Sequence, residues 1–328
     1  MSQALSITGS TGITAGVTTY GARLVELMTP DRSGRTSNIV LGFDTTEAYR
    51  EHVDLYLGAT VGPVAGRIAG GRFRGGGLKL DLPPNEGPTH LHGGAVSAFD
   101  RLDWDVVDAT TDAVEFRYIR PDGEGGYPGD LDVRARYRLI GTELQLSFTA
   151  TTTRETPINL VNHTYFNLSG DAARSIVDHS LTIAASTILE ADERLLPTGG
   201  TRDVEGTALD FRTERRIGDQ LPVGGEPWPG IDNTFVLEAN ARNAAVLYEP
   251  VSGRTLEITT SEPTLQVYTG NRIPQLEGRA GSQLEQGSGI CLEAQRVPDA
   301  PELPEWPTIV VPAGGTYRQT TVWRLGTR

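Results

Sequence analysis

The chain has 328 residues, of which 22% are charged and 38% are apolar, a composition typical of a folded globular protein. Its formal net charge of −13 disfavours nucleic acid and anionic membrane surfaces as partners, because both attract basic patches. The N-terminal residues lack the basic and apolar segments of a secretory signal, and no apolar run reaches the roughly 18 residues of a membrane span. Cys291 is the only cysteine, so we predict a cytoplasmic protein without disulfide bonds.

Most of the predicted elements are short β-strands. Few windows show a helical period, and the best of them, Thr45–Leu57, favours a short helix. From Leu131 to Leu139 apolar residues alternate with charged ones, Gly141 starts a turn, and the alternation resumes from Leu144 to Ala150, which predicts a hairpin. Further strands are predicted at Val114–Tyr118, Ala244–Tyr248, Thr255–Thr259, Thr264–Tyr268, Ile290–Ala294 and Thr320–Arg324.

Turn residues are dense along the whole chain, with 39 glycines and 20 prolines. No linker, low-complexity segment or internal repeat marks a domain boundary. The pattern therefore predicts an all-β protein with few short helices, folded as one large antiparallel domain over residues 1–328.

His90 and His92 form an H-x-H pair beside Pro88. On a strand both rings would point the same way, as in a metal site or a contact to a polar substrate. Metal-binding cupin barrels follow such a pair with a glutamate, and the segment HLHGGAVSAFD has none, so we predict no metal. The proline and the following glycines indicate a loop at a strand end, where binding residues tend to lie.

The segment INLVNHTYFNLSG, residues 158–170, alternates as a β-strand does, yet its polar positions hold unusual side chains. They are Asn159, Asn162, His163, Asn167 and Ser169. Burying these groups without partners would be costly, and a ligand rich in hydroxyl groups would satisfy them. We interpret the segment as the floor of a sugar site.

Three further residues are ambiguous when taken alone. Glu293 shares a predicted strand face with Cys291 and Gln295, and is either a solvated glutamate or part of a polar site. Asp232 follows a loop rich in glycine and proline, as a turn aspartate does. Arg67 stands among glycines that lack the phosphate-loop pattern and favour turns.

Several longer motifs run in order along nearly the whole chain: NIVLGFDTTEAY, LGATVGPVAGRIAGGRF, NEGPTHLHGG with AFDRLDW, DGEGGYPGDL, INLVNHTYFNLSG, IDNTFVL, LQVYTGN, CLEAQRVPDAPE and TYRQTTVWRL. Together they resemble the aldose 1-epimerase (galactose mutarotase) family. The resemblance implies a β-sandwich of many antiparallel strands with an open cleft on one sheet face. It also implies a cofactor-independent isomerase that exchanges the α and β anomers of a free aldose, such as glucose or galactose.

The resemblance also implies roles for individual residues. His163 corresponds to the family's general acid and Glu293 to its general base. The sugar contacts correspond to Arg67, His92, Asp232 and Gln266. The family usually has asparagine before the arginine, where this chain has Gly66, so we expect Gly66→Asn to lower KM unless Gly66 has a positive φ.

Three alternatives stay open at this point. A hexose-6-phosphate mutarotase would need additional Lys or Arg residues beside the sugar. A glycosidase would use a carboxylate pair, for which Glu293 and Asp232 are candidates. A non-catalytic sugar-binding protein would not need both His163 and Glu293. The sequence does not distinguish a monomer from a homodimer, or one preferred aldose from another.

Overall fold

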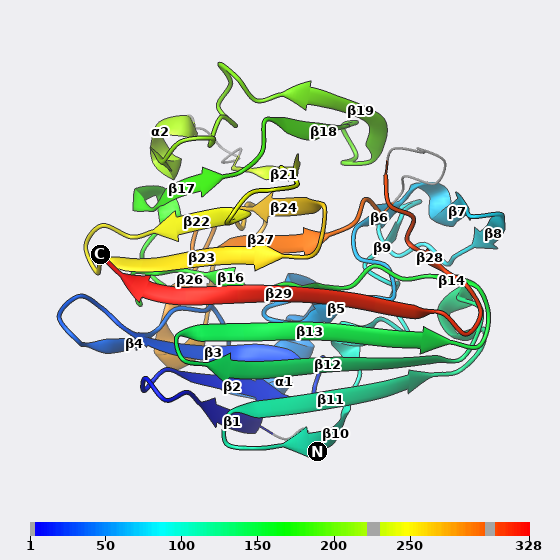
Figure 1. Ribbon diagram of the computed structural model, residues 1–328, viewed down its shortest axis with the longest axis horizontal. Helices are drawn as coiled ribbons and strands as arrows, with labels where there is room; N and C mark the ends of the chain where they lie inside the picture. The colour runs from blue at the N-terminus through cyan, green and yellow to red at the C-terminus, as the bar shows by residue number, and fades with distance from the viewer. Residues whose placement is uncertain (1–3, 222–229, 299–305) are drawn as a thin grey trace.

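The fold is built from facing antiparallel sheets, and the computed structural model describes residues 4–221, 230–298 and 306–328. The largest sheet in these residues has nine strands in the order β10-β11-β12-β13-β29-β23-β22-β17-β20 (Figure 1). Their bounds are Asp105–Ala109, Ala113–Arg120, Leu131–Ile140, Glu143–Thr152, Thr316–Thr327, Arg254–Thr260, Ala245–Tyr248, Ser180–Ile183 and Arg215–Arg216, in that order.

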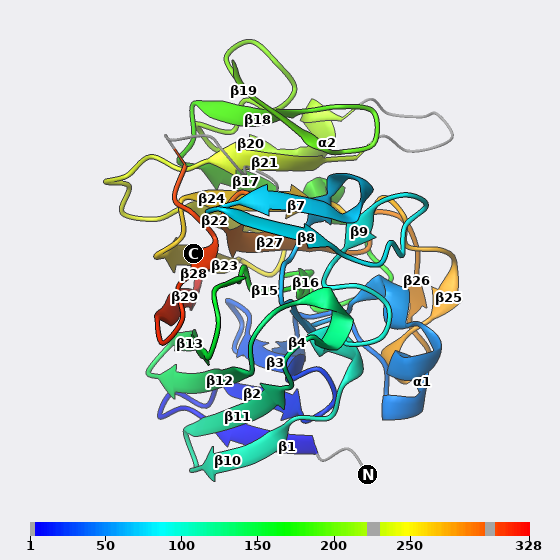
Figure 2. The same ribbon diagram turned by 90° about the vertical axis from the view of Figure 1, so that its right-hand side faces the viewer.

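Two further sheets pack against one face of the nine-stranded sheet (Figure 2). One has six strands, β16 (Tyr165–Phe166), β27 (Ile290–Gln295), β24 (Thr264–Tyr268), β21 (Asp232–Val236), β18 (Thr187–Ala191) and β19 (Pro197–Asp203). The other has four, β1 (Ala4–Thr8), β2 (Thr14–Thr18), β3 (Arg23–Pro30) and β4 (Thr36–Asn38). The layers meet where Trp323 packs edge-on against Phe166, with ring centroids 5.8 Å apart.

Alternation between apolar and charged residues gives each strand of the large sheet one apolar face, and the sheets pack together through these faces. In β12 every second residue is buried, and the side chains on the other face are only half-buried or exposed. On that outer face Arg134 lies 2.7 Å from Glu115 of β11. The hairpin predicted from this period is confirmed, and so is the all-β antiparallel fold class.

The helices are short, as predicted. The window Thr45–Leu57 forms α1 (Thr46–Glu51) and a single 3₁₀ turn, Val53–Leu55, rather than one continuous helix. Thr45 caps α1 by accepting a hydrogen bond from the Ala48 amide, and the left-handed backbone of Tyr56 ends the 3₁₀ turn. The second α-helix of the described residues is α2 (Ile217–Gln220).

Short two-stranded pairs complete the fold at the edges of the larger sheets. They are β5 (Thr60–Val61) with β15 (Val161–Asn162), β6 (Arg67–Ile68) with β9 (His90–Leu91), β7 (Arg72–Gly75) with β8 (Leu78–Asp81), β14 (Thr156–Pro157) with β28 (Val310–Val311), and β25 (Leu276–Glu277) with β26 (Gln283–Leu284). None of the helices described is long and apolar enough to cross a membrane.

The main hydrophobic core lies between the sheets and holds residues from Ile7 to Leu325, and three smaller apolar clusters lie beside it. We propose that residues 1–328 form a single domain, because the main core draws on strands of all three large sheets.

Candidate active site

A cleft of about 540 Å³ lies on the six-stranded sheet, on the face opposite the core. Its walls include all six residues to which the family resemblance assigned a role: Arg67, His92, His163, Asp232, Gln266 and Glu293. They come from four strands and two loops that are far apart in the chain.

The centre of the cleft holds a buried imidazole and a buried carboxylate. His163 Nε2 lies 3.7 Å from Glu293 Oε1, and their side chains are only 7% and 4% exposed. His163 Nδ1 lies 3.4 Å from the thiol of Cys291. Tyr56 and Tyr165 pack against the His163 ring at centroid distances of 5.5 and 5.1 Å. This packing holds the ring with its Nε2 edge towards Glu293.

Strand pairing explains why these two side chains meet. β16 follows His163 by two residues and pairs with β27, which carries Glu293. β27 also pairs with β24, where Gln266 lies directly opposite Glu293. Ile290, Leu292 and Ala294 of β27 enter the core, so Glu293 must point to the other face.

Burial shifts both titrations towards the uncharged forms. It lowers the pKa of His163 to about 4. Burial and the nearby carboxylate of Asp232 raise the pKa of Glu293 well above its ordinary value. At a pH between these two pKa values the pair holds one proton. In the cleft without sugar, neutral His163 with protonated Glu293 is more stable than the ion pair.

Asp232 and Gln266 form the wall beside Glu293. Gln266 Nε2 donates to Asp232 Oδ1 over 2.7 Å, and the hydroxyl of Thr234 donates to Gln266 Oε1. Asp232 is therefore the first residue of β21 and a cleft residue, not the turn aspartate that it resembles in isolation.

Arg67 is fixed by a carboxylate that the sequence analysis did not single out. Its Nε and Nη2 donate to the two oxygens of Glu86 over 2.7 and 2.9 Å, and these bonds lower the pKa of Glu86. Arg272 also approaches Glu86, at 3.4 Å. The bidentate pair orients the guanidinium, which is 15% exposed at the cleft wall.

His92 is held by Gly66 through two hydrogen bonds. The Gly66 amide donates to His92 Nδ1 over 3.1 Å, and the His92 amide donates to the Gly66 carbonyl over 3.1 Å. Burial, and then the charges of His163 and Arg67, keep the pKa of His92 well below its usual value. Since Nδ1 accepts, the neutral ring carries its proton on Nε2 and can donate from there.

Gly66 has φ +83°, so the condition attached to its expected substitution is met. A Cβ at this position would lie 2.6 Å from Pro298 Cγ. We therefore expect Gly66→Asn to raise KM rather than lower it, because the left-handed backbone and the contact with Pro298 cost about 1–2 kcal/mol and disturb the bonds to His92. Steady-state kinetics and a melting curve would check this, with Gly66→Ala as the control that adds strain without an amide. A lower KM in Gly66→Asn alone would contradict it.

His90 and His92 do not share a site, because only His90 lies on a strand; the predicted loop at the strand end is confirmed. β9 ends at Leu91, and His92 has φ +54°, which turns its side chain out of register. The His90 ring is buried between the Tyr127 hydroxyl at 2.8 Å and the Pro83 carbonyl at 2.6 Å.

Only His163 and Tyr165 of segment 158–170 line the cleft, so the segment as a whole is not its floor. The segment is not one strand but two dipeptides, β15 and β16. Its asparagines bind protein backbone: Asn162 donates to the Gly58 carbonyl over 2.9 Å and Asn167 to the Ser288 carbonyl over 2.8 Å. A sugar is not needed to satisfy them.

Among the residues that the structure describes, one group has the chemistry of a metal site. Donor atoms of His163, Cys291 and Glu293 lie within 4.8 Å of one another. However, the ring presents Nδ1 to the thiol and Nε2 to the carboxylate, so neither nitrogen faces both other donors. A shared ion would require the ring to turn between its packed tyrosines.

We therefore expect the rate of anomer exchange to survive prolonged treatment with EDTA. The measurement compares treated and untreated protein by polarimetry, before and after Zn²⁺ or Mn²⁺ is added back. Loss of rate on chelation, with recovery on adding either ion, would sink this prediction.

The cleft does not favour a phosphorylated sugar. Its three arginines are already paired: Arg67 and Arg272 with Glu86, and Arg101 with Asp54 at 2.7 Å. Four carboxylates line the same walls, namely Asp54, Glu86, Asp232 and Glu293. A phosphate would have to compete with Glu86 and Asp54 for the guanidinium groups that they already bind.

Sequence reasoning missed several residues that line the cleft: Tyr56, Asn85, Glu86, Arg101, Tyr268 and Arg272. Glu86 and Asn85 belong to the motif NEGPTHLHGG, and that motif was the one available signal for them. Asn85 binds both the amide and the carbonyl of Leu91, over 2.7 and 3.0 Å, and so supports His92.

Comparisons with known proteins agree with this geometry. The family model described as aldose 1-epimerase matches residues 3–324. Galactose mutarotase of Mus musculus is 40% identical over 316 residues, covering 95% of this chain and 91% of the relative. A solved aldose epimerase homologue from C. elegans has a TM-score of 0.92 at 28% identity, covering 100% of this chain and 99% of that one. Galactose 1-epimerase from Lactobacillus acidophilus NCFM has a TM-score of 0.84 at 30% identity, covering 99% and 94%.

Proposed function

Because the chain belongs to the aldose 1-epimerase family and is an isomerase that exchanges the anomers of a free aldose, we propose that His163 and Glu293 carry the two proton transfers. The single observation that supports this most is their separation of 3.7 Å in the buried centre of the cleft. When a sugar ring lies against them, one group can accept the proton of the C1 hydroxyl while the other donates a proton to the ring oxygen O5.

Ring opening needs the charged form of the pair. Glu293 as carboxylate takes the proton from the C1 hydroxyl, and His163 as imidazolium gives a proton to O5. The C1–O5 bond breaks, and the products are an open-chain aldehyde, protonated Glu293 and neutral His163. Rotation about C1–C2 presents the other face of the aldehyde, and closure reverses both transfers. The pair ends the cycle as it began, with no net proton gained or lost.

The electrostatics of the cleft favour the protonation state that exists while the sugar is open. Protonated Glu293 and neutral His163 are the form that burial stabilises, and they are also the form left after ring opening. The site thereby offsets part of the free energy that separates the open-chain aldehyde from the ring. The charged form of the pair needs hydrogen-bonding partners, and the hydroxyl groups of a bound sugar supply them.

Arg67, His92, Asp232 and Gln266 are the proposed sugar contacts. Arg67 and the His92 Nε2–H donate, whereas Asp232 accepts and Gln266 can do both. Polarimetry of fresh α-D-galactose, α-D-glucose, a pentose and glucose 6-phosphate tests the substrate class. We expect faster mutarotation of the free sugars than of the phosphate, and the reverse order would count against the proposal.

The rate should depend on pH as a bell, because activity needs one proton on the pair. His163 would take up the second proton as pH falls towards its pKa of about 4, which defines the acid limb. The last proton leaves as pH rises through the raised pKa of Glu293, which defines the alkaline limb. A pH–rate profile of wild type and His163→Asn measures this. An acid limb at about 6.5, the ordinary histidine value, would show that burial does not control His163.

We further propose a cytoplasmic monomer or homodimer that binds neither nucleic acid nor membranes. The net charge of −13 and the single, buried, free Cys291 support this. Sedimentation velocity of the purified protein would decide between monomer and homodimer.

A further inference from the structure

The segment that carries His163 continues into β16, which on one side of the site pairs through its backbone with β27, the strand that carries Glu293. There Tyr165 pairs with Cys291 and Phe166 with Ile290. On the other side the chain turns away from β27, and Val161 and Asn162 pair with β5 instead. The distance between imidazole and carboxylate therefore depends on what joins the strands beyond this gap.

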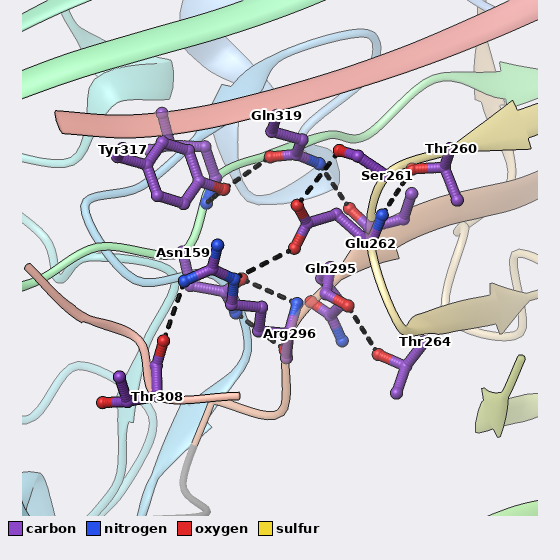
Figure 3. Close-up of polar contacts among 12 residues, drawn as sticks. Asn159, Thr260, Ser261, Glu262, Thr264, Gln295, Arg296, Thr308, Tyr317 and Gln319 are labelled. Carbon is purple, nitrogen blue, oxygen red and sulfur yellow. Dashed lines mark hydrogen bonds and ion pairs between the residues drawn. The ribbon is translucent and has the colours of Figure 1, made fainter. Parts of the chain in front are cut away.

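A buried asparagine amide spans the gap (Figure 3). Asn159 Nδ2 donates to the Arg296 carbonyl over 3.0 Å, and the Arg296 amide donates to Asn159 Oδ1 over 3.0 Å. Asn159 precedes His163 by four residues, and Arg296 follows Glu293 by three. The backbone of Asn159 is occupied elsewhere, by the Pro63 carbonyl and the Ala65 amide. The Asn159 side chain thus makes, with the backbone of Arg296 at the end of β27, the two hydrogen bonds that a neighbouring strand would make.

The partner of this amide is itself held firmly. Arg296 Nη1 donates to the Thr308 carbonyl over 2.8 Å, and its Nε lies 3.4 Å from the buried carboxylate of Glu262. The guanidinium also lies 5.3 Å from the centre of the Tyr317 ring. Residue 296 is therefore a fixed point at the end of β27.

A second connection runs from the His163 segment to β27 through β29 (Figure 3). The Leu160 amide donates to the Tyr317 hydroxyl over 3.2 Å, and that hydroxyl donates to Gln319 Oε1 over 2.6 Å. Gln319 Nε2 then donates to the Ala294 carbonyl over 2.8 Å. Leu160 belongs to the His163 segment and Ala294 directly follows Glu293, so this chain of bonds also sets their separation.

We propose that Asn159 is a positioning residue that, together with the Tyr317–Gln319 connection, holds His163 and Glu293 at their working distance. This inference rests on the acid and base roles proposed above. Asn159 is fully buried and does not line the cleft, so it can affect the reaction only through the residues that it places. Asn159 is also not one of the proposed sugar contacts. Its side chain reaches towards them only through a long bond, 3.5 Å, from Nδ2 to the Ala65 carbonyl, and the Ala65 amide keeps its bond to the Asn159 backbone when the side chain is removed.

The test is Asn159→Ala, assayed by polarimetry in the full-length chain. We expect kcat to fall about tenfold to a hundredfold, because a displacement on the order of 1 Å between reacting groups has effects of that size. KM should stay within about twofold, since the sugar contacts remain. Tyr317→Phe, which removes one hydroxyl from the second connection, should lower kcat about two- to tenfold in the same way.

Asn38→Ala is the matched control. The Asn38 amide also makes several backbone bonds, to Leu27 and Val40, but neither of these residues lines the cleft. We expect this variant to lose stability, by less than Asn159→Ala because Asn38 is only half-buried, and to keep the kcat of wild type. It separates a loss of positioning from a general loss of stability.

Glu293→Gln supplies the second arm. If Asn159 acts through the pair, Asn159→Ala should reduce kcat far less in the Glu293→Gln background than in wild type. A wild-type kcat for folded Asn159→Ala, or a loss of equal size in both backgrounds, would overturn the positioning role. If Asn159→Ala does not fold, an unchanged kcat for Tyr317→Phe overturns it. Near-normal kcat in Glu293→Gln alone would instead overturn the proposed catalytic roles.

Discussion

His163→Asn and Glu293→Gln should each lower kcat by about 10²–10⁴-fold, because each removes one of the two groups that transfer protons during ring opening. Glu293→Gln keeps the size of the side chain, and its amide cannot accept the proton from the C1 hydroxyl. His163→Asn leaves a polar side chain that cannot protonate O5. Polarimetry on fresh α-D-galactose, corrected for the spontaneous rate, measures both effects.

Both variants should remain folded, since neither side chain contributes an apolar group to the core. Melting curves and far-UV circular dichroism provide the control. A kcat within about threefold of wild type in either folded variant would remove that residue from the mechanism.

Arg67→Met should raise KM by roughly 10- to 100-fold with a smaller change in kcat, because a hydrogen bond from a charged group contributes about 1.5–3 kcal/mol. The bidentate pair with Glu86 presents the guanidinium in one orientation at the cleft wall. Methionine fills the space of the side-chain stem and provides no donor. Initial rates over a range of galactose concentrations give KM and kcat separately.

Removing Arg67 also leaves the partly buried Glu86 without its main partner, which could itself disturb the cleft. The double variant Arg67→Met/Glu86→Gln removes that unpaired charge and isolates the loss of the donor. Should its KM lie within about twofold of the wild-type value, Arg67 does not bind the sugar.

The large sheet was the most predictable part of the fold. Strands such as β12 separate core from solvent, so their alternation is strict and their limits are confirmed within one or two residues. β27 is buried on both faces, and its alternation identifies faces without saying what covers them. That is why Glu293 was ambiguous until the resemblance to a family gave it a role.

The segment 158–170 shows where residue patterns mislead. A buried asparagine is satisfied equally well by a sugar hydroxyl or by a backbone carbonyl, and the sequence does not distinguish the two. Here the asparagines bind backbone and join strands that are distant in the chain, as Asn159 joins Arg296 across 137 positions. Glu86 was missed for a related reason, because its pairing with Arg67 depends on the β6–β9 contact.

The central claim is that His163 and Glu293 share one proton and act as a unit. The most direct test is kcat for wild type, His163→Asn, Glu293→Gln and the double variant, measured on the same sugar at the same pH. Groups that work only together lose their whole effect when either is removed, so the double variant should be little slower than the slower single variant. A double variant in which the two losses multiply would show that the groups act independently, and would contradict the claim.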